Sequence, residues 1–261
     1  MDALCINQKD TLERNDQVKR MIEIYKRSTQ TLVWLGEYDF DEGEGISGVR
    51  DFLVTASTLP QSAEVPDLAT TIEFSDIQHA FMLADLPWFS RVWVLQEVAV
   101  AKEVTLMCNE VSFPWATFVD GLSAAGYQEN VSHAVRTLSR WHEKSTKAAK
   151  FCREYAQDDI LRNKFTDTPL PDRLLSLLLD SNGLDATDAR NHVFALIGLA
   201  GSHEELVLEP SLAINYDLSP IQVLKRTAVY LLQSTRDPSI LYGASSTPAQ
   251  RQLGIPSWVP T

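Results

Sequence analysis

The sequence is poor in basic residues and has no long apolar run. Its 23 Lys and Arg are outnumbered by 35 Asp and Glu, which gives a formal net charge of −12. Nucleic acids and anionic membranes attract basic surfaces, so we expect neither as a partner of a protein with this negative net charge. No stretch approaches the roughly 18 apolar residues that a membrane-spanning helix needs, and the start MDALCINQ has no signal-peptide pattern.

Cysteine is also scarce, and the familiar catalytic motifs are missing. Cys5, Cys108 and Cys152 lie far apart without a CxxC pair, and the five histidines show no metal-ligand spacing. We therefore expect no metal and no bound cofactor, and reduced thiols in a cytoplasmic protein, with Cys5 the one candidate for a reactive cysteine. P-loop, GxGxxG, GxSxG and HExxH patterns do not occur, which excludes the enzyme classes that depend on them.

The N-terminal pattern is typical of an α/β sheet. DALCI reads as the end of a buried strand, and a helix over 11–28 follows, with Asp10 as its cap and Glu13 completing a capping box. TLVWLG is a short β-rich run closed by glycine. The sequence therefore predicts that 2–6 and 31–35 are adjacent parallel strands. Because a strand stands at the first residue, we also expect a missing upstream strand and an exposed position in the sheet where it would pair.

The rest of the chain is mainly helical in pattern. The Asp188–Arg190 turn is expected to cap a helix and to anchor a salt bridge. A strand is predicted over 102–109, and helices are predicted over 46–59, 74–86, from Pro114 onward into a polar helical stretch reaching 165, Leu170–Leu179 and Pro220–Ser234.

The stretch WFSRVWVLQEVAVA, residues 88–101, carries a carboxylate in an apolar setting. Pro87 suits the first turn of a helix, and on one continuous helix Ser90, Trp93 and Glu97 would share a face. A buried, unpaired carboxylate costs several kcal/mol. Two interpretations stay open: a structural glutamate bonded to backbone amides or an arginine, or a carboxylate lining a pocket with Trp93 as its wall.

The loop after the first expected strand is a second candidate for ligand contact. Ligands of open α/β sheets bind beyond the carboxyl ends of strands, which would place Asn7, Gln8 and the backbone near Cys5 against a ligand. Asn7 and Gln8 are equally suited to ordinary turn chemistry.

Four stretches together resemble the heterokaryon incompatibility (HET) domain of filamentous fungi. They are DALCINQKDTLERNDQVKRMIEIYKRSTQTLVWLG, LPWFSRVWVLQEVAVAKEV, DARNHVFALIGLA and IPSWVP. The resemblance implies a HET α/β core over 1–110, with its first strand missing, and a helical elaboration with an extended tail over 111–261. It implies a Toll/interleukin-1 receptor (TIR)-like open, mostly parallel sheet flanked by helices. Asn191 departs from the family's usual aspartate, and the family's upstream Tyr-x-x-Leu-Ser-Tyr-x-Trp-Gly block is not in this sequence.

The resemblance also implies a function. HET domains act in non-self recognition, where incompatible fusion triggers programmed cell death, so the expected partners are the protein itself or other incompatibility proteins. The TIR kinship implies an alternative, in which a helical glutamate cleaves the nicotinamide–ribose bond of NAD as substrate. Trp93 and Glu97 match that motif's spacing, which makes Glu97 the catalytic candidate and Trp93, Cys5, Asn7 and Gln8 ligand contacts; Ser90 is out of register and is not carried over.

Overall fold

A computed structural model describes residues 6–38, 45–58, 74–126, 168–235 and 237–238. Two compact units are each assembled from segments distant in sequence. The first comprises Met1–Arg27, Arg91–Val100 and Glu154–Thr261, and the second comprises Ser28–Ser90 and Ala101–Arg153. The expected division into residues 1–110 and 111–261 concerns the extent of the family domain, and it stays a prediction.

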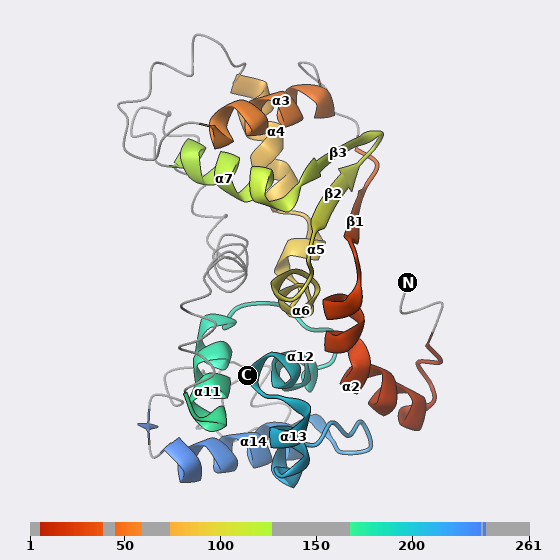
Figure 1. Ribbon diagram of the computed structural model, residues 1–261, viewed down its shortest axis with the longest axis vertical. Helices are drawn as coiled ribbons and strands as arrows, with labels where there is room; N and C mark the ends of the chain where they lie inside the picture. Colours follow the sequence, from red (N-terminus) through yellow and green to blue (C-terminus); the bar gives the residue numbers. More distant parts are fainter. Residues whose placement is uncertain (1–5, 39–44, 59–73, 127–167, 236, 239–261) are drawn as a thin grey trace. The chain divides into compact units, whose positions relative to one another are not determined.

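The second unit contains a three-stranded mixed sheet (Figure 1). Its strands are β1 (Thr31–Gly36), β2 (Val104–Cys108) and β3 (Val111–Pro114), in the order β1-β2-β3. β1 pairs with β2 in parallel, whereas β2 and β3 form an antiparallel pair. The expected α/β character is therefore confirmed, but the TIR-like open, mostly parallel sheet is not: within the described ranges the sheet is small and the fold is mostly helical.

One face of this sheet carries the core of the second unit. Val33, Leu106 and Phe113 occupy one cross-strand row and are 3%, 0% and 2% exposed. Leu32 and Trp34 point to the opposite face of β1 and are 61% and 54% exposed. This alternation follows from the two-residue period of a strand, which sends successive side chains to opposite faces.

Among the described residues, the second unit also contains the helices α3 (Ile46–Ser57), α4 (Phe74–Ala84), α5 (Pro87–Ser90) and α7 (Trp115–Gly126). α3 packs closely against α7, because Gly121 lacks a side chain: a Cβ there would lie 2.8 Å from the backbone oxygen of Leu53. Phe89 stacks on Phe118 at 5.2 Å between ring centroids, which extends the core with aromatic packing.

The first unit is built from helices in the described part of the chain (Figure 1). Its central helix, α12 (Asn191–Ala200), buries seven of its residues. Around it lie α2 (Thr11–Arg27), α6 (Val94–Ala99), α11 (Leu170–Asp180) and α14 (Pro220–Thr235); the short helices α13 (His203–Val207) and η2 (Pro210–Leu212) complete the unit. None of the described helices is long and apolar enough to cross a membrane.

The expected continuous helix over 88–101 is wrong. The structure has a short helix, α5 (Pro87–Ser90), and then α6, with an interruption between them. Arg91 forms a parallel bridge with Asp185, and the backbone N–H of Val92 donates to the carbonyl of Asp185 at 3.0 Å. A helix cannot continue through a residue whose N–H is used in this way, because its hydrogen bonds must close within the helix. The boundary between the two units also falls between Ser90 and Arg91.

Several other expectations are confirmed. α2 and β1 occupy the predicted ranges, and α11 and α14 match the predicted leucine-rich and C-terminal helices. The predicted strand over 2–6 falls largely on residues outside the described ranges; Ile6, its last member, forms a bend. The pairing of 2–6 with β1 therefore stays a prediction, as does the sheet position expected for a strand upstream.

Candidate functional site

α6 places two adjacent polar side chains inside the first unit. All six residues of this helix are buried, including Gln96 at 1% and Glu97 at 7% exposure. A six-residue helix with polar side chains in its buried surface needs other elements to satisfy them. The apolar sequence around Glu97 thus correctly indicated burial, although the helix that carries it is shorter than expected.

Trp93 and Glu97 remain one turn apart despite the interruption. The backbone N–H of Glu97 donates to the carbonyl of Trp93 at 3.2 Å, and Trp93 is half-buried. Ser90 lies before the interruption, on α5, and its hydroxyl donates to the carbonyl of Pro87 at 3.1 Å. The expected shared face of Ser90, Trp93 and Glu97 on one helix is therefore wrong, while the Trp93–Glu97 interval persists.

The loop at 6–10 is built as a helix-capping turn. The side-chain oxygen of Asn7 accepts from the N–H of Lys9 at 3.2 Å, and Asp10 Oδ1 accepts from the N–H groups of Leu12 and Glu13 at 2.9 and 3.1 Å. Asp10 therefore caps α2, as the sequence predicted.

The reciprocal bond of the cap differs from the expected capping box. The Glu13 side chain accepts from the backbone N–H of Asn7 at 3.3 Å. In a capping box it would accept from the backbone N–H of the cap residue, Asp10. Asn7 and Gln8 are exposed, and Cys5 lies outside the described ranges. The part of all three in ligand contact stays a prediction.

Three of the sequence blocks named above meet at Gln96. Its Nε2 donates to the carbonyl of Ala195 on α12 at 2.9 Å. Gly198, one turn further along α12, leaves the space that this contact needs: a Cβ there would lie 3.1 Å from Gln96 Nε2 and 3.3 Å from Ile22 Cβ on α2. The blocks around α2, α6 and α12 therefore pack on one another at a single junction, which we call the α2–α6–α12 junction.

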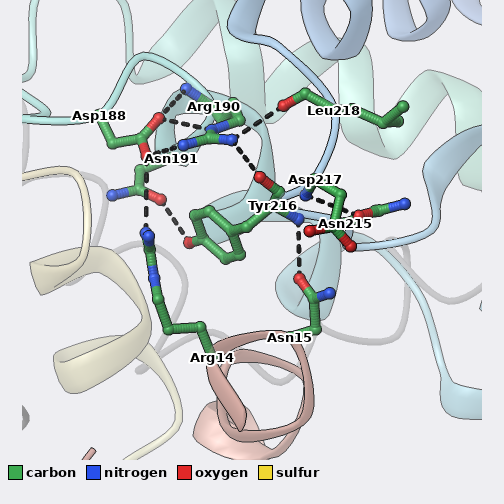
Figure 2. Close-up of polar contacts among 9 residues, drawn as sticks. All are labelled: Arg14, Asn15, Asp188, Arg190, Asn191, Asn215, Tyr216, Asp217 and Leu218. Carbon is green, nitrogen blue, oxygen red and sulfur yellow. Dashed lines mark hydrogen bonds and ion pairs between the residues drawn. The ribbon is translucent and has the colours of Figure 1, made fainter. Parts of the chain in front are cut away.

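A charged cluster joins the segment before α12 to the segment before α14. Arg190 forms a bidentate pair with Asp188, with Nε to Oδ1 at 2.9 Å and Nη2 to Oδ2 at 2.6 Å. Its Nη1 donates to the carbonyl oxygens of Tyr216 and Leu218 at 2.5 and 2.8 Å. Figure 2 shows the guanidinium between these acceptors. Four of its five N–H groups are accounted for, so the side chain is held rigidly.

α2 joins the same cluster through its first turn (Figure 2). The Arg14 guanidinium carbon lies 3.8 Å from the centre of the Tyr216 ring, and its Nη2 is 3.5 Å from Asp188 Oδ2. The side-chain oxygen of Asn15 accepts from the N–H of Tyr216 at 2.7 Å, and the Tyr216 hydroxyl donates to Asn191 at 2.6 Å. We call Arg14, Asp188, Arg190 and Tyr216 the arginine–tyrosine cluster.

The electrostatics of this cluster follow from its partial burial. Burial alone would raise the pKa of Asp188, but hydrogen bonds from Arg190 and the charges of Arg190 and Arg14 lower it below its usual value. The bond to Asp188 raises the pKa of Arg190. Burial raises the pKa of Tyr216 to about 12, although Arg14 acts in the opposite direction. All three groups therefore keep one protonation state at neutral pH, which suits a structural clamp better than proton transfer.

The sequence predicted only part of the arginine–tyrosine cluster. The expected salt bridge is confirmed in the ion pair of Asp188 and Arg190. The expected cap is wrong: α12 begins after Arg190 without a side-chain cap bond, and Asp188 Oδ1 instead accepts from the backbone N–H of Arg190 at 3.1 Å. Arg14 and Tyr216 were missed. The available signal was that Arg14 stands one turn before Val18, on the apolar side of α2. The described residues hold no group of three or more His, Cys, Asp or Glu that could bind a metal.

Comparison with known proteins relates part of the sequence to one family. Residues 1–97 match the family described as heterokaryon incompatibility protein (HET). A curated relative, heterokaryon incompatibility protein 6, OR allele, of Neurospora crassa, is 23% identical over an alignment of 301 residues, covering 100% of this chain and 44% of the relative. The chain thus spans less than half the length of that relative. No solved structure matches it.

The family match ends at Glu97, whereas the full-length alignment continues through α12 and α14. The matched region contains α2 and the Val94–Glu97 part of α6, and both helices pack on α12 at the α2–α6–α12 junction. The first 97 residues, the relative and the four sequence blocks all point to one family, and the chain is similar to heterokaryon incompatibility proteins of fungi.

Proposed function

We propose that this chain acts in heterokaryon incompatibility, as the HET domain of a protein that responds to non-self after fusion of fungal cells. The observation that carries the proposal is the α2–α6–α12 junction, which brings two parts of the family-matched segment, α2 and α6, together with the later DARNHVFALIGLA block in one packed unit. The name of the Neurospora crassa relative points the same way. The proposal places the protein in the cytoplasm.

We further propose that the response is programmed cell death and that self-association triggers it. The support is the exposed face of β1, where Leu32 and Trp34 are 61% and 54% exposed beside the half-buried Met107 on β2. Exposed apolar side chains gathered on one face are typical of protein–protein contact sites, and tryptophan is enriched among the residues that dominate binding energy. A second copy of this chain is the occupant we propose.

Trp34→Lys tests self-association directly. The variant places a charge in the proposed interface, so we expect it to abolish both association, measured by light scattering after size-exclusion chromatography, and death of fused cells expressing the full-length protein. Met82→Lys is the matched control, because Met82 is 58% exposed on the helix α4 rather than on a strand of the sheet. A Trp34→Lys protein that still associates and still kills would contradict the proposal.

A second candidate function is cleavage of NAD by Glu97. The observation that favours it is a carboxylate only 7% exposed, one helical turn after the half-buried Trp93. In the proposed reaction the bond between nicotinamide and ribose breaks, and its electron pair leaves with nicotinamide. Glu97 stabilises the positive charge that develops on the ribose, and water then adds to the anomeric carbon and releases a proton. The products are nicotinamide and ADP-ribose.

Release of nicotinamide from NAD by the purified chain tests this second function. We expect Glu97→Gln to abolish release, because it keeps the shape of the side chain and removes its charge. Glu103→Gln, the same exchange at an exposed position before β2, is the control and should retain full activity. If Glu97→Gln cleaves NAD at the wild-type rate, Glu97 is not the catalytic group.

A further inference from the structure

Gln96 combines features that helix packing alone does not require. Its side chain is 1% exposed, and only one end of its amide is used: Nε2 donates to Ala195, whereas Oε1 is buried and accepts no hydrogen bond from the described residues. A buried acceptor without a donor is destabilising, and a polar group kept at such a position calls for an explanation. An apolar side chain of similar length would fill the same space without this penalty.

The surroundings of Gln96 are shaped around its donor. The Ala195 carbonyl lies inside α12, and Gly198 is the residue that allows the amide to reach it, since a Cβ at Gly198 would lie 3.1 Å from Nε2. Ile22 of α2 closes the same space from the other side. The bond therefore fixes how far α6 is rotated about its own axis relative to α12.

The rotation of α6 determines where the neighbouring carboxylate points. Adjacent residues on a helix project about 100° apart, so an amide fixed on Ala195 sets the direction of Glu97 on the same short helix. We propose that Gln96 is a positioning residue: its Nε2–H···O=C bond to Ala195 holds Glu97 in the orientation that nicotinamide–ribose cleavage needs. This inference rests on the proposed use of Glu97 in that reaction.

Gln96→Met in the full chain tests the inference, with NAD as substrate and nicotinamide release as the assay. Methionine keeps the length of the side chain and its buried surface but cannot donate to Ala195. We expect kcat to fall about 100-fold, the size of effect that a small misplacement of a reacting group produces, with KM within about twofold of wild type. The melting temperature should stay within about 2 °C of wild type or rise, because the unpaired Oε1 is removed.

Gln233→Met provides the control, since it is the same exchange at an exposed position of α14 and should leave kcat, KM and melting temperature unchanged. A Gln96→Met protein with wild-type kcat overturns the inference. So does one whose loss of activity is matched by loss of folding, because the amide then serves stability alone. If wild type does not cleave NAD, or if Glu97→Gln still cleaves it, the proposed role of Glu97 is wrong. The positioning role of Gln96 is then wrong as well, because it depends on that of Glu97. An inactive Glu97→Gln beside an active Gln96→Met overturns the inference alone.

Discussion

Replacing Arg190 by alanine should destabilise the first unit more than any exchange of a surface arginine. The change removes the bidentate pair with Asp188 and the two hydrogen bonds to the carbonyls of Tyr216 and Leu218. It also leaves the Asp188 carboxylate, whose side chain is 20% exposed, with the backbone N–H of residue 190 at 3.1 Å and the 3.5 Å contact to Arg14.

The magnitude follows from how far the pair is buried. Removing one partner of a buried ion pair costs about 3–5 kcal/mol, whereas an exposed pair contributes about 0–1 kcal/mol. Arg190 and Asp188 have 16% and 20% of their side chains exposed, which places the pair nearer the buried limit. With the two carbonyl bonds included, we expect Arg190→Ala to lower the free energy of unfolding by about 3 kcal/mol.

Urea unfolding followed by circular dichroism measures this loss, with Arg20→Ala as the control. Arg20 pairs with Asp16 at 3.0 Å on the surface of α2, where both side chains are more than half exposed, so its loss should cost about 0.3–0.5 kcal/mol. A cost for Arg190→Ala below about 1 kcal/mol would contradict a stabilising, partly buried ion pair, because Arg190 and Asp188 would then behave like a surface pair.

The pH dependence of the unfolding free energy tests the same ion pair independently. The pKa of Asp188 is lowered in the folded protein, so its contribution to stability is present above the unfolded pKa of about 3.9 and is lost as pH falls through the lower folded value. The difference in unfolding free energy between wild type and Asp188→Asn should therefore be largest near neutral pH. It should decrease as the pH falls below about 4. A difference that grows on acidification would contradict the assignment.

Three further predictions concern packing, titration and a turn. Gly121→Ala should cost about 1–3 kcal/mol in urea unfolding, because the added Cβ would lie 2.8 Å from a backbone oxygen; full stability would contradict the close approach of α3 and α7. Burial lowers the pKa of His192, against the opposing charge of Asp185, so stability should fall as pH drops below about 6.5, and His192→Gln should remove that slope. Asn109 has φ 51 and holds both the N–H and the carbonyl of Tyr38 at 2.8 Å; Asn109→Gly should lose these bonds but keep the turn, whereas Asn109→Ala should be less stable than the glycine variant.

The sequence predicted those elements whose causes are local. α2 was recognised from its cap and its helical spacing, and α11 from its leucine spacing after a proline. The helix over 88–101 was wrong because the interruption comes from Asp185, a residue far along the chain whose pairing no local pattern reveals. β3 was missed because VSFP has only four residues and ends in proline, which is weak strand signal.

The candidate site was predictable to a similar degree. The apolar neighbours of Glu97 indicated a buried carboxylate, and it is buried. The partners of Gln96 on α12 lie about a hundred positions away in sequence, with Ala195 at a separation of 99. Arg14 and Tyr216 are in contact although they lie about twice as far apart in sequence, and no periodicity connects them. Contacts of this kind follow from tertiary packing, which a single sequence does not specify residue by residue.

The proposal that this protein acts in heterokaryon incompatibility is tested most directly by the survival of fused cells. The measurement is the frequency of cell death in incompatible pairings of strains that carry the intact gene, compared with pairings in which it is deleted and with pairings in which it is restored. We expect deletion to abolish the death response and restoration of the wild-type gene to return it. An unchanged frequency of cell death after deletion would contradict it.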